Sequence, residues 1–174
     1  MSKPTSSEQK MGQSMIYVAW IIFLIFLTLG FNRWYEKQHN PNQSPQGNIN
    51  ADNAAEVTLL RNRQGHYVAN GKINGQTVTF ILDTGATVIS IPASLAKRLN
   101  LPAGTPHSVA TANGNTTAYS TRLNQVSLGP IQLDDVRASI TPGFKGNNIL
   151  LGMNFLKHLE LIQRGNKLIL RQYH

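Results

Sequence analysis

An uncharged and largely apolar run near the amino terminus does most to limit how this chain can fold. No Asp, Glu, Lys or Arg occurs from Met11 to Asn32, and the run from Met15 to Phe31 is almost continuously apolar. At the rise of an α-helix the 22 uncharged residues span roughly 33 Å, against about 30 Å for the hydrocarbon core of a bilayer. We therefore predict a transmembrane helix over 15–35, after an amino-terminal tail of 1–14.

A cleaved signal peptide is the main alternative for this run, and a buried globular helix is a third. The run is longer than the apolar region of most signal peptides, and Thr28-Leu29-Gly30 is a poor cleavage site. Basic residues balance on the two flanks, with Lys3 and Lys10 before the run and Arg33 and Lys37 after it. The helix is thus expected to contact membrane lipid, while charge alone leaves its orientation open.

The segment after the helix has the composition of a flexible connection. From Gln38 to Glu56 it is rich in Asn, Gln, Pro and Gly and has almost no large apolar residue. Such a segment buries too little apolar surface to fold by itself. We predict a flexible linker over 36–56, with a root-mean-square reach of roughly 23 Å, and a folded domain over 57–174.

The domain reads as a series of short strands joined by tight turns. In the expected strand from Gln76 to Leu82, Val78, Phe80 and Leu82 share one face and Thr77, Thr79 and Ile81 share the other. Helical patterns are limited to 92–99 and 154–158. Hairpin or turn signals recur at Asn74-Gly75, Asn113-Gly114, Gly129-Pro130 and Arg164-Gly165-Asn166. The pattern predicts an all-β domain, closed or sandwiched, with one or two short helices.

Composition argues against several classes of function. The 16 Lys and Arg and 8 Asp and Glu give a net charge of +8, but the basic residues form no dense run, and aromatic residues are 7% of the chain, so we expect no nucleic-acid partner. The chain has no cysteine, which excludes disulfides and thiol catalysis. The five histidines show no close ligand spacing and no HExxH motif, so we expect neither a metal nor another cofactor.

The motif with the clearest chemical meaning is Asp83-Thr84-Gly85-Ala86, which follows the strand that ends at Leu82. An Asp-Thr-Gly followed by a small residue occurs by chance in fewer than roughly one chain in a hundred. The structural alternative is a plain turn, in which Asp83 bonds its own backbone and Gly85 relieves steric strain. Apolar residues flank the motif on both sides, and a carboxylate held between buried segments favours a functional role.

Two segments carry a family resemblance. Ile81–Thr87 resembles the active-site loop of retropepsin-like (clan AA) aspartic peptidases, and Ile149–Leu156 resembles the apolar segment, glycine and short helix that brace this loop, particularly in bacterial membrane-anchored members. Taken alone, the second segment also fits an ordinary buried strand that runs into a helix. The resemblance extends from about Val57 to the end of the sequence. It implies a closed, retropepsin-like β-barrel subunit.

The resemblance also implies roles for individual residues. Asp83 would be catalytic, Thr84 would hydrogen-bond across two facing loops, Gly85 would let the substrate backbone approach, and Ala86 would line the cleft. The hairpin around Asn113 and Gly114 would be a flap that binds substrate. Viral members usually have a flap tip richer in glycine, and an ordinary surface hairpin is the alternative at this position.

Aspartic peptidase chemistry needs two carboxyl groups that share one proton. The chain has only four aspartates, Asp52, Asp83, Asp134 and Asp135, and a single Asp-Thr-Gly. Asp52 falls in the predicted linker, and the adjacent Asp134 and Asp135, which we expect in a solvated turn, would point to opposite faces of a strand. A homodimer solves this shortage, because a two-fold axis brings Asp83 opposite its own copy.

These observations together predict a membrane-anchored aspartic endopeptidase that hydrolyses polypeptides with water activated between the two Asp83 carboxyls. The alternative is a non-catalytic module of the same fold that dimerises or binds peptides at the membrane. By resemblance to anchored bacterial proteins, we expect a single-pass protein of a bacterial inner membrane with the peptidase domain in the periplasm.

Overall fold

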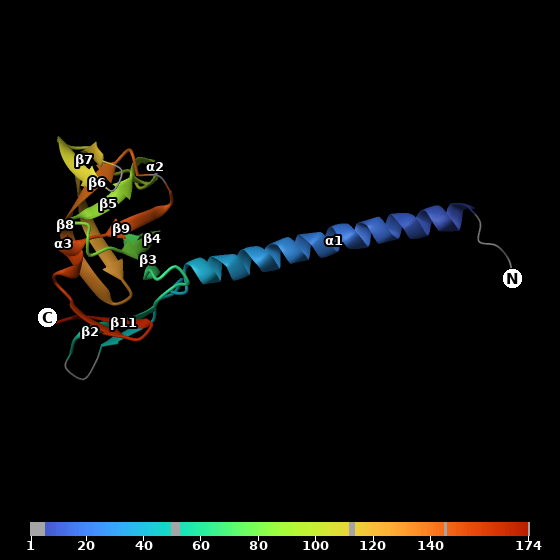
Figure 1. Ribbon diagram of the computed structural model, residues 1–174, viewed down its shortest axis with the longest axis horizontal. Coiled ribbons are helices and arrows are strands. Elements are labelled where there is room, and N and C mark those ends of the chain that lie inside the picture. Colours follow the sequence, from blue (N-terminus) through green and yellow to red (C-terminus); the bar gives the residue numbers. More distant parts are fainter. Residues whose placement is uncertain (1–5, 50–52, 112–113, 145, 174) are drawn as a thin grey trace. The chain divides into compact units, whose positions relative to one another are not determined.

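The computed structural model describes residues 6–49, 53–111, 114–144 and 146–173. The chain forms two compact units, Met1–Gln38 and His39–His174. The described part of the first lies in a single helix, α1 (Ser6–His39), within which Met15–His39 is long enough to cross a bilayer and contains an 18-residue stretch with a mean hydropathy of 2.2 (Figure 1). Its length and composition fit a membrane anchor or a signal sequence.

The second unit is built from two sheets, which confirms the predicted all-β fold. The larger sheet has seven strands in the order β3-β4-β9-β5-β8-β7-β6, and a further pairing between β3 and β7 makes it return on itself. Its strands are β3 (Val68–Ile73), β4 (Gln76–Leu82), β5 (Ile89–Pro92), β6 (Pro106–Thr111), β7 (Gly114–Leu128), β8 (Ile131–Thr141) and β9 (Asn148–Leu151). The described part of the second unit also contains two short helices, α2 (Ala93–Arg98) and α3 (Met153–Leu156).

The smaller sheet, here called the terminal sheet, joins strands from both ends of this unit. Its order is β1-β2-β11-β10, with every pairing antiparallel. The strands are β1 (Gly47–Ile49), β2 (Ala55–Leu60), β10 (Glu160–Arg164) and β11 (Lys167–Gln172). Figure 1 shows β2 and β11 side by side. One face of this pair is buried in the core and includes Ala55, Val57, Leu59, Leu168 and Leu170.

Local sequence explains most of these elements. Val78 and Phe80 of β4 are buried, as alternation predicts. Asn74 and Gly75 have φ values of 49° and 81°, which suits the tight turn between β3 and β4. Asp134 and Asp135 are exposed and lie in a strand, β8, as expected, so only their expected place in a turn is wrong.

The structure differs from the predicted flexible linker over 36–56. Helix α1 continues to His39, β1 pairs with β2, and Asn42 is only 6% exposed. The Nδ2 group of Asn42 donates to the carbonyl oxygens of Leu60 (2.9 Å) and Val68 (2.7 Å), and its Oδ1 accepts from the Leu60 N–H at 2.7 Å. Residues 39–43 of this polar segment are held by hydrogen bonds, and the compact unit begins at His39 rather than at residue 57.

Replacing Asn42 with alanine should destabilise the unit 39–174 by about 2–3 kcal/mol, because three backbone groups lose their partner inside the protein. Urea unfolding of this fragment followed by circular dichroism measures the loss. Asn48→Ala is the matched control: this asparagine in β1 is exposed, and its removal should change the unfolding free energy by less than about 0.5 kcal/mol. Equal effects of the two substitutions would contradict a structural role for Asn42.

Candidate active site

Two neighbouring strands bring Asp83 to a defined position. Strand β4 lies between β3, to which it is antiparallel, and β9, to which it is parallel, with Leu82 in register with Leu151. The Leu82 N–H donates to the carbonyl oxygen of Tyr67 at 3.0 Å, and the Asp83 N–H donates to that of Leu151 at 3.2 Å. The backbone is therefore fixed on both sides up to the point where the Asp83 side chain emerges.

The motif residues form one tight turn. The Oδ1 atom of Asp83 accepts from the Gly85 N–H at 2.8 Å, and its carbonyl oxygen accepts from the Ala86 N–H at 3.2 Å. Asp83 and Ala86 are partly buried, whereas Thr84 and Gly85 are exposed. The bond to Gly85 is the one expected of a simple turn, so evidence for a function must come from what surrounds it.

The segment after β9 is hydrogen-bonded to the residues that follow this turn. The Met153 N–H donates to the carbonyl oxygen of Ala86 at 2.8 Å, and the Asn154 N–H donates to that of Thr87 at 3.0 Å. Gly152 lies against the same backbone: a Cβ atom there would be 2.5 Å from the Val88 carbonyl oxygen and 2.7 Å from that of Ala86. Gly152 has an extended backbone that any residue can adopt (φ −84°, ψ 179°), so the requirement for glycine is purely steric.

The side chain of Asn154 also holds this loop in place, and Gly152–Asn154 are here called the brace. Its Oδ1 accepts from the Ile89 N–H at 3.0 Å, at the start of β5, and its Nδ2 donates to the carbonyl oxygen of Arg137 in β8 at 2.6 Å. Sequence analysis placed Asn154 only within a short helix and gave it no role. Both partners of its side chain are distant in sequence, and an isolated asparagine gives no local signal of such contacts.

The predicted flap hairpin is present as strands β6 and β7. Pro106–Thr111 pairs with Gly114–Tyr119, and Gly114 has a φ of 102°, which favours glycine at this turn. Asn113, the other predicted tip residue, lies outside the described residues. The structure places Gly114 in an element separate from the Asp83 turn, and its role in substrate binding stays a prediction.

A cavity of about 510 Å³ borders the same loop. It is lined by Thr87 and Val88 and by residues of β8 and α3, but by neither Asp83 nor Thr84. Asp83 is therefore not part of this cavity. Within the part of the chain that the structure describes, no group of three or more His, Asp or Glu side chains could hold a metal ion.

Comparison with known proteins agrees with this geometry. The chain is 28% identical to an uncharacterized protein of Sinorhizobium sp. over 95% of its length and 76% of that protein. It is 26% identical to an uncharacterized protein of Rickettsia prowazekii (strain Madrid E), over 68% of this chain and 52% of the relative.

Among solved structures, a retropepsin-like aspartic protease from Rickettsia conorii superposes with a TM-score of 0.59 at 28% identity, over 68% of this chain and 92% of that one. This likeness confirms the retropepsin-like fold. The family model for gag-polyprotein putative aspartyl proteases matches residues 69–158, a range that includes both the Asp83 turn and the Gly152–Asn154 brace. The chain therefore belongs to the family of gag-polyprotein putative aspartyl proteases.

Proposed function

We propose that this protein is a membrane-anchored aspartic endopeptidase that acts as a homodimer on unfolded polypeptides. The observation that carries the proposal is the Asp83 turn itself, partly exposed and braced by Gly152 and Asn154 within the segment that matches an aspartyl protease family. The direct test is cleavage of unfolded casein by the full-length chain in detergent. Asp83→Asn should abolish that cleavage.

In the proposed mechanism, two Asp83 carboxyls face each other and share a proton. The ionised one takes a proton from a water molecule, which attacks the peptide carbonyl, while the protonated one donates a hydrogen bond to the carbonyl oxygen. Thr84 would link the two loops, and Gly85 and Ala86 would border the substrate. Asn113 and Gly114 would cover it as a flap.

The need for a second chain follows from where the other described aspartates lie. Asp134 and Asp135 are exposed on β8, and Asp135 forms an ion pair with Arg122. Both line the cavity described above, which Asp83 does not line. A symmetry copy of Asp83 is the simplest source of a second carboxyl.

The edge of the terminal sheet offers a surface for this dimer. In the described sheet, β10 pairs with β11 alone. Antiparallel pairing of β10 with its own copy, centred on Ile162, would place Glu160 opposite Arg164 of the partner subunit, twice. Such a strand edge is a natural template for pairing, and opposite charges across it select the antiparallel register.

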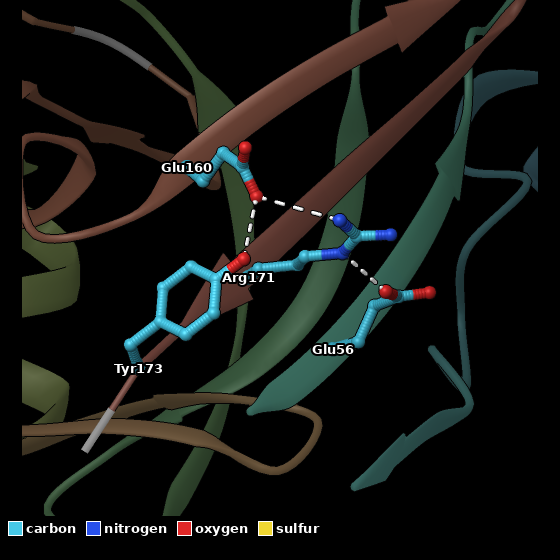
Figure 2. Close-up of polar contacts among 4 residues, drawn as sticks. All are labelled: Glu56, Glu160, Arg171 and Tyr173. Atoms are coloured by element: carbon cyan, nitrogen blue, oxygen red, sulfur yellow. Dashed lines mark hydrogen bonds and ion pairs between the residues drawn. The ribbon is translucent and has the colours of Figure 1, made fainter. Parts of the chain in front are cut away.

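Glu160 is already held in place on this face, as Figure 2 shows. Its Oε2 atom accepts from the Tyr173 hydroxyl at 3.1 Å and from Nη1 of Arg171 at 3.5 Å. Arg171 also donates through Nε to Glu56 at 2.6 Å, a bond that raises the pKa of Arg171 above its ordinary value. The network fixes one acidic group beside the β10 edge, where the proposed partner would bring a basic one.

Arg164→Glu should weaken the dimer roughly 5- to 30-fold, because two attractive pairs become two repulsive ones, worth about 1–2 kcal/mol in total. Sedimentation equilibrium of residues 39–174 measures the dissociation constant, and peptidase activity should fall in parallel at low protein concentration. Lys157→Glu makes the same charge change on an exposed side chain outside the terminal sheet and should leave dimerisation unchanged. If Arg164→Glu also leaves it unchanged, the dimer does not form through β10.

The anchor and its location complete the proposal. Helix α1 would serve as a single-pass anchor in contact with lipid, with the unit His39–His174 in the periplasm of a bacterium. Support for the anchor is the length and hydropathy of Met15–His39. The periplasmic location is supported by the resemblance to anchored bacterial members of the family.

A further inference from the structure

The residues that follow helix α1 form what we call the helix-end clamp: His39–Gln43 together with Asn62 and Asn70. Nδ2 of Asn62 donates to the His39 carbonyl oxygen at 3.0 Å, and Nδ2 of Asn40 donates to Oδ1 of Asn70 at 2.8 Å. The backbone N–H of Asn70 donates to the Asn42 carbonyl oxygen at 3.0 Å, and Nδ2 of Asn70 donates to that of Gln43 at 2.9 Å. With the three bonds of the Asn42 amide, nearly every residue of this segment is fastened to β2 or β3 or to the turn between them.

Two side chains of the clamp are buried inside the unit His39–His174. Asn42 is 6% exposed and Asn62 is 8% exposed. Oδ1 of Asn62 also accepts from the N–H groups of Gln64 and His66, at 3.0 and 2.9 Å, and so shapes the turn that leads into β3. The clamp cannot open without leaving buried amide groups unpaired, which is costly.

The clamp begins at the residue where the helix ends. Helix α1 includes His39, and His39 already accepts the bond from Asn62. A flexible linker of the predicted length would give an average reach of roughly 23 Å and a maximum of about 70 Å. No such free segment lies between α1 and the clamp. A unit of this size has a radius of gyration of about 14 Å, so all of its surface lies within roughly 40 Å of the helix end.

We propose that the helix-end clamp restricts the peptidase to substrates presented close to the bilayer, namely unfolded polypeptide segments that adjoin a membrane anchor. This inference rests on the proposed function, including the anchor. A substrate anchored in the same membrane meets the enzyme at a raised effective concentration only if its cleavable segment lies within reach. Because no free segment separates the helix from the domain, the zone that the active site can reach is about as deep as the domain itself.

The test uses the full-length protein in vesicles of phosphatidylethanolamine and phosphatidylglycerol. The near substrate carries a disordered casein segment directly after a transmembrane helix. The far substrate carries the same segment after a proline-rich spacer of about 40 residues, which extends roughly 120 Å. The same casein segment without an anchor is the third substrate. We expect the near substrate to be cut at least about tenfold faster than the far one, with cleavage positions mapped by mass spectrometry.

A matched pair of insertions tests the role of the clamp. The same proline-rich spacer placed between Gln38 and His39 keeps the clamp intact but moves the domain outward, and should reduce or reverse the preference for the near substrate. The spacer placed before Ser6, on the other side of the helix, should leave the preference unchanged.

Equal rates on the near and far substrates, or a preference that does not respond to the spacer after Gln38, would overturn the inference while leaving the peptidase in place. Release of the chain from vesicles by alkaline carbonate would overturn it too, because the anchor would be absent. A lack of cleavage of every substrate, free casein included, would instead overturn the proposed function on which the inference depends.

Discussion

Asp83→Asn is expected to abolish cleavage of unfolded casein, with a fall in rate of at least about 10³-fold. In a homodimer this one substitution removes both carboxyls, so neither a base for water nor a shared proton is left. Asparagine keeps the shape of the side chain, and its Oδ1 can still accept from the Gly85 N–H, the bond of 2.8 Å that holds the turn. The folded state should therefore survive. New amino termini, counted by a fluorogenic amine reagent, measure the activity of the full-length chain in detergent.

Asp134→Asn is the matched control for this experiment, since it removes a carboxylate that is exposed on β8. It should retain near-normal activity, and both variants should show the circular dichroism spectrum and dimer content of the parent. Substantial cleavage by Asp83→Asn would rule out the proposed mechanism. Saturable peptide binding by the unaltered chain, without cleavage at any pH, would favour the non-catalytic module of the same fold.

Gly152→Ala should cost at least about 3 kcal/mol of unfolding free energy and eliminate most activity. A Cβ atom at this position would be 2.5 and 2.6 Å from the carbonyl oxygen and carbon of Val88, and 2.7 Å from the carbonyl oxygen of Ala86. All three are backbone atoms of the loop that follows Asp83, so no side chain can turn aside to make room. The loop or β9 must shift, which breaks the short bonds from Met153 and Asn154. Urea unfolding measures the destabilisation.

Gly143→Ala provides the comparison, because a Cβ there would meet only the Thr116 hydroxyl oxygen, at 3.4 Å. Its effect should stay below about 0.5 kcal/mol. If Gly152→Ala matched this control in stability and retained activity, the loop would be free to adjust, and the brace from β9 and α3 could not be what positions Asp83.

The fold was predictable where the sequence carries a strong local period or an unusual turn. Strand β4 matches the predicted alternation from Gln76 to Leu82, and the Asn74-Gly75 turn has the positive φ angles that this pair favours. The Asp-Thr-Gly-Ala motif was equally easy to recognise in the sequence, because its residues are contiguous. The motif alone does not reveal its neighbours in space. The structure shows that Gly152 packs closely against the backbone of the loop that follows Asp83.

The helix-end clamp was missed for a physical reason. Asn40 and Asn42 lie in a polar segment with no apolar period, and composition alone makes such a segment look disordered. Their order comes from hydrogen bonds to Leu60, Val68 and Asn70, whose positions depend on the tertiary fold. Asn154 was overlooked in the same way, since the backbone groups that it joins lie in β5 and β8.

The position of β11 has a consequence for the order in which this unit folds during synthesis. Among the described strands it comes last in chain order, yet it lies between β2 and β10 and joins them into one sheet. During synthesis, β2 has no neighbour on that side until Lys167–Gln172 has emerged, so a nascent chain that already displays its Asp-Thr-Gly-Ala sequence still lacks the surface on which two subunits would meet. The terminal sheet therefore assembles only after β11 has been synthesised, however early the Asp83 motif emerges.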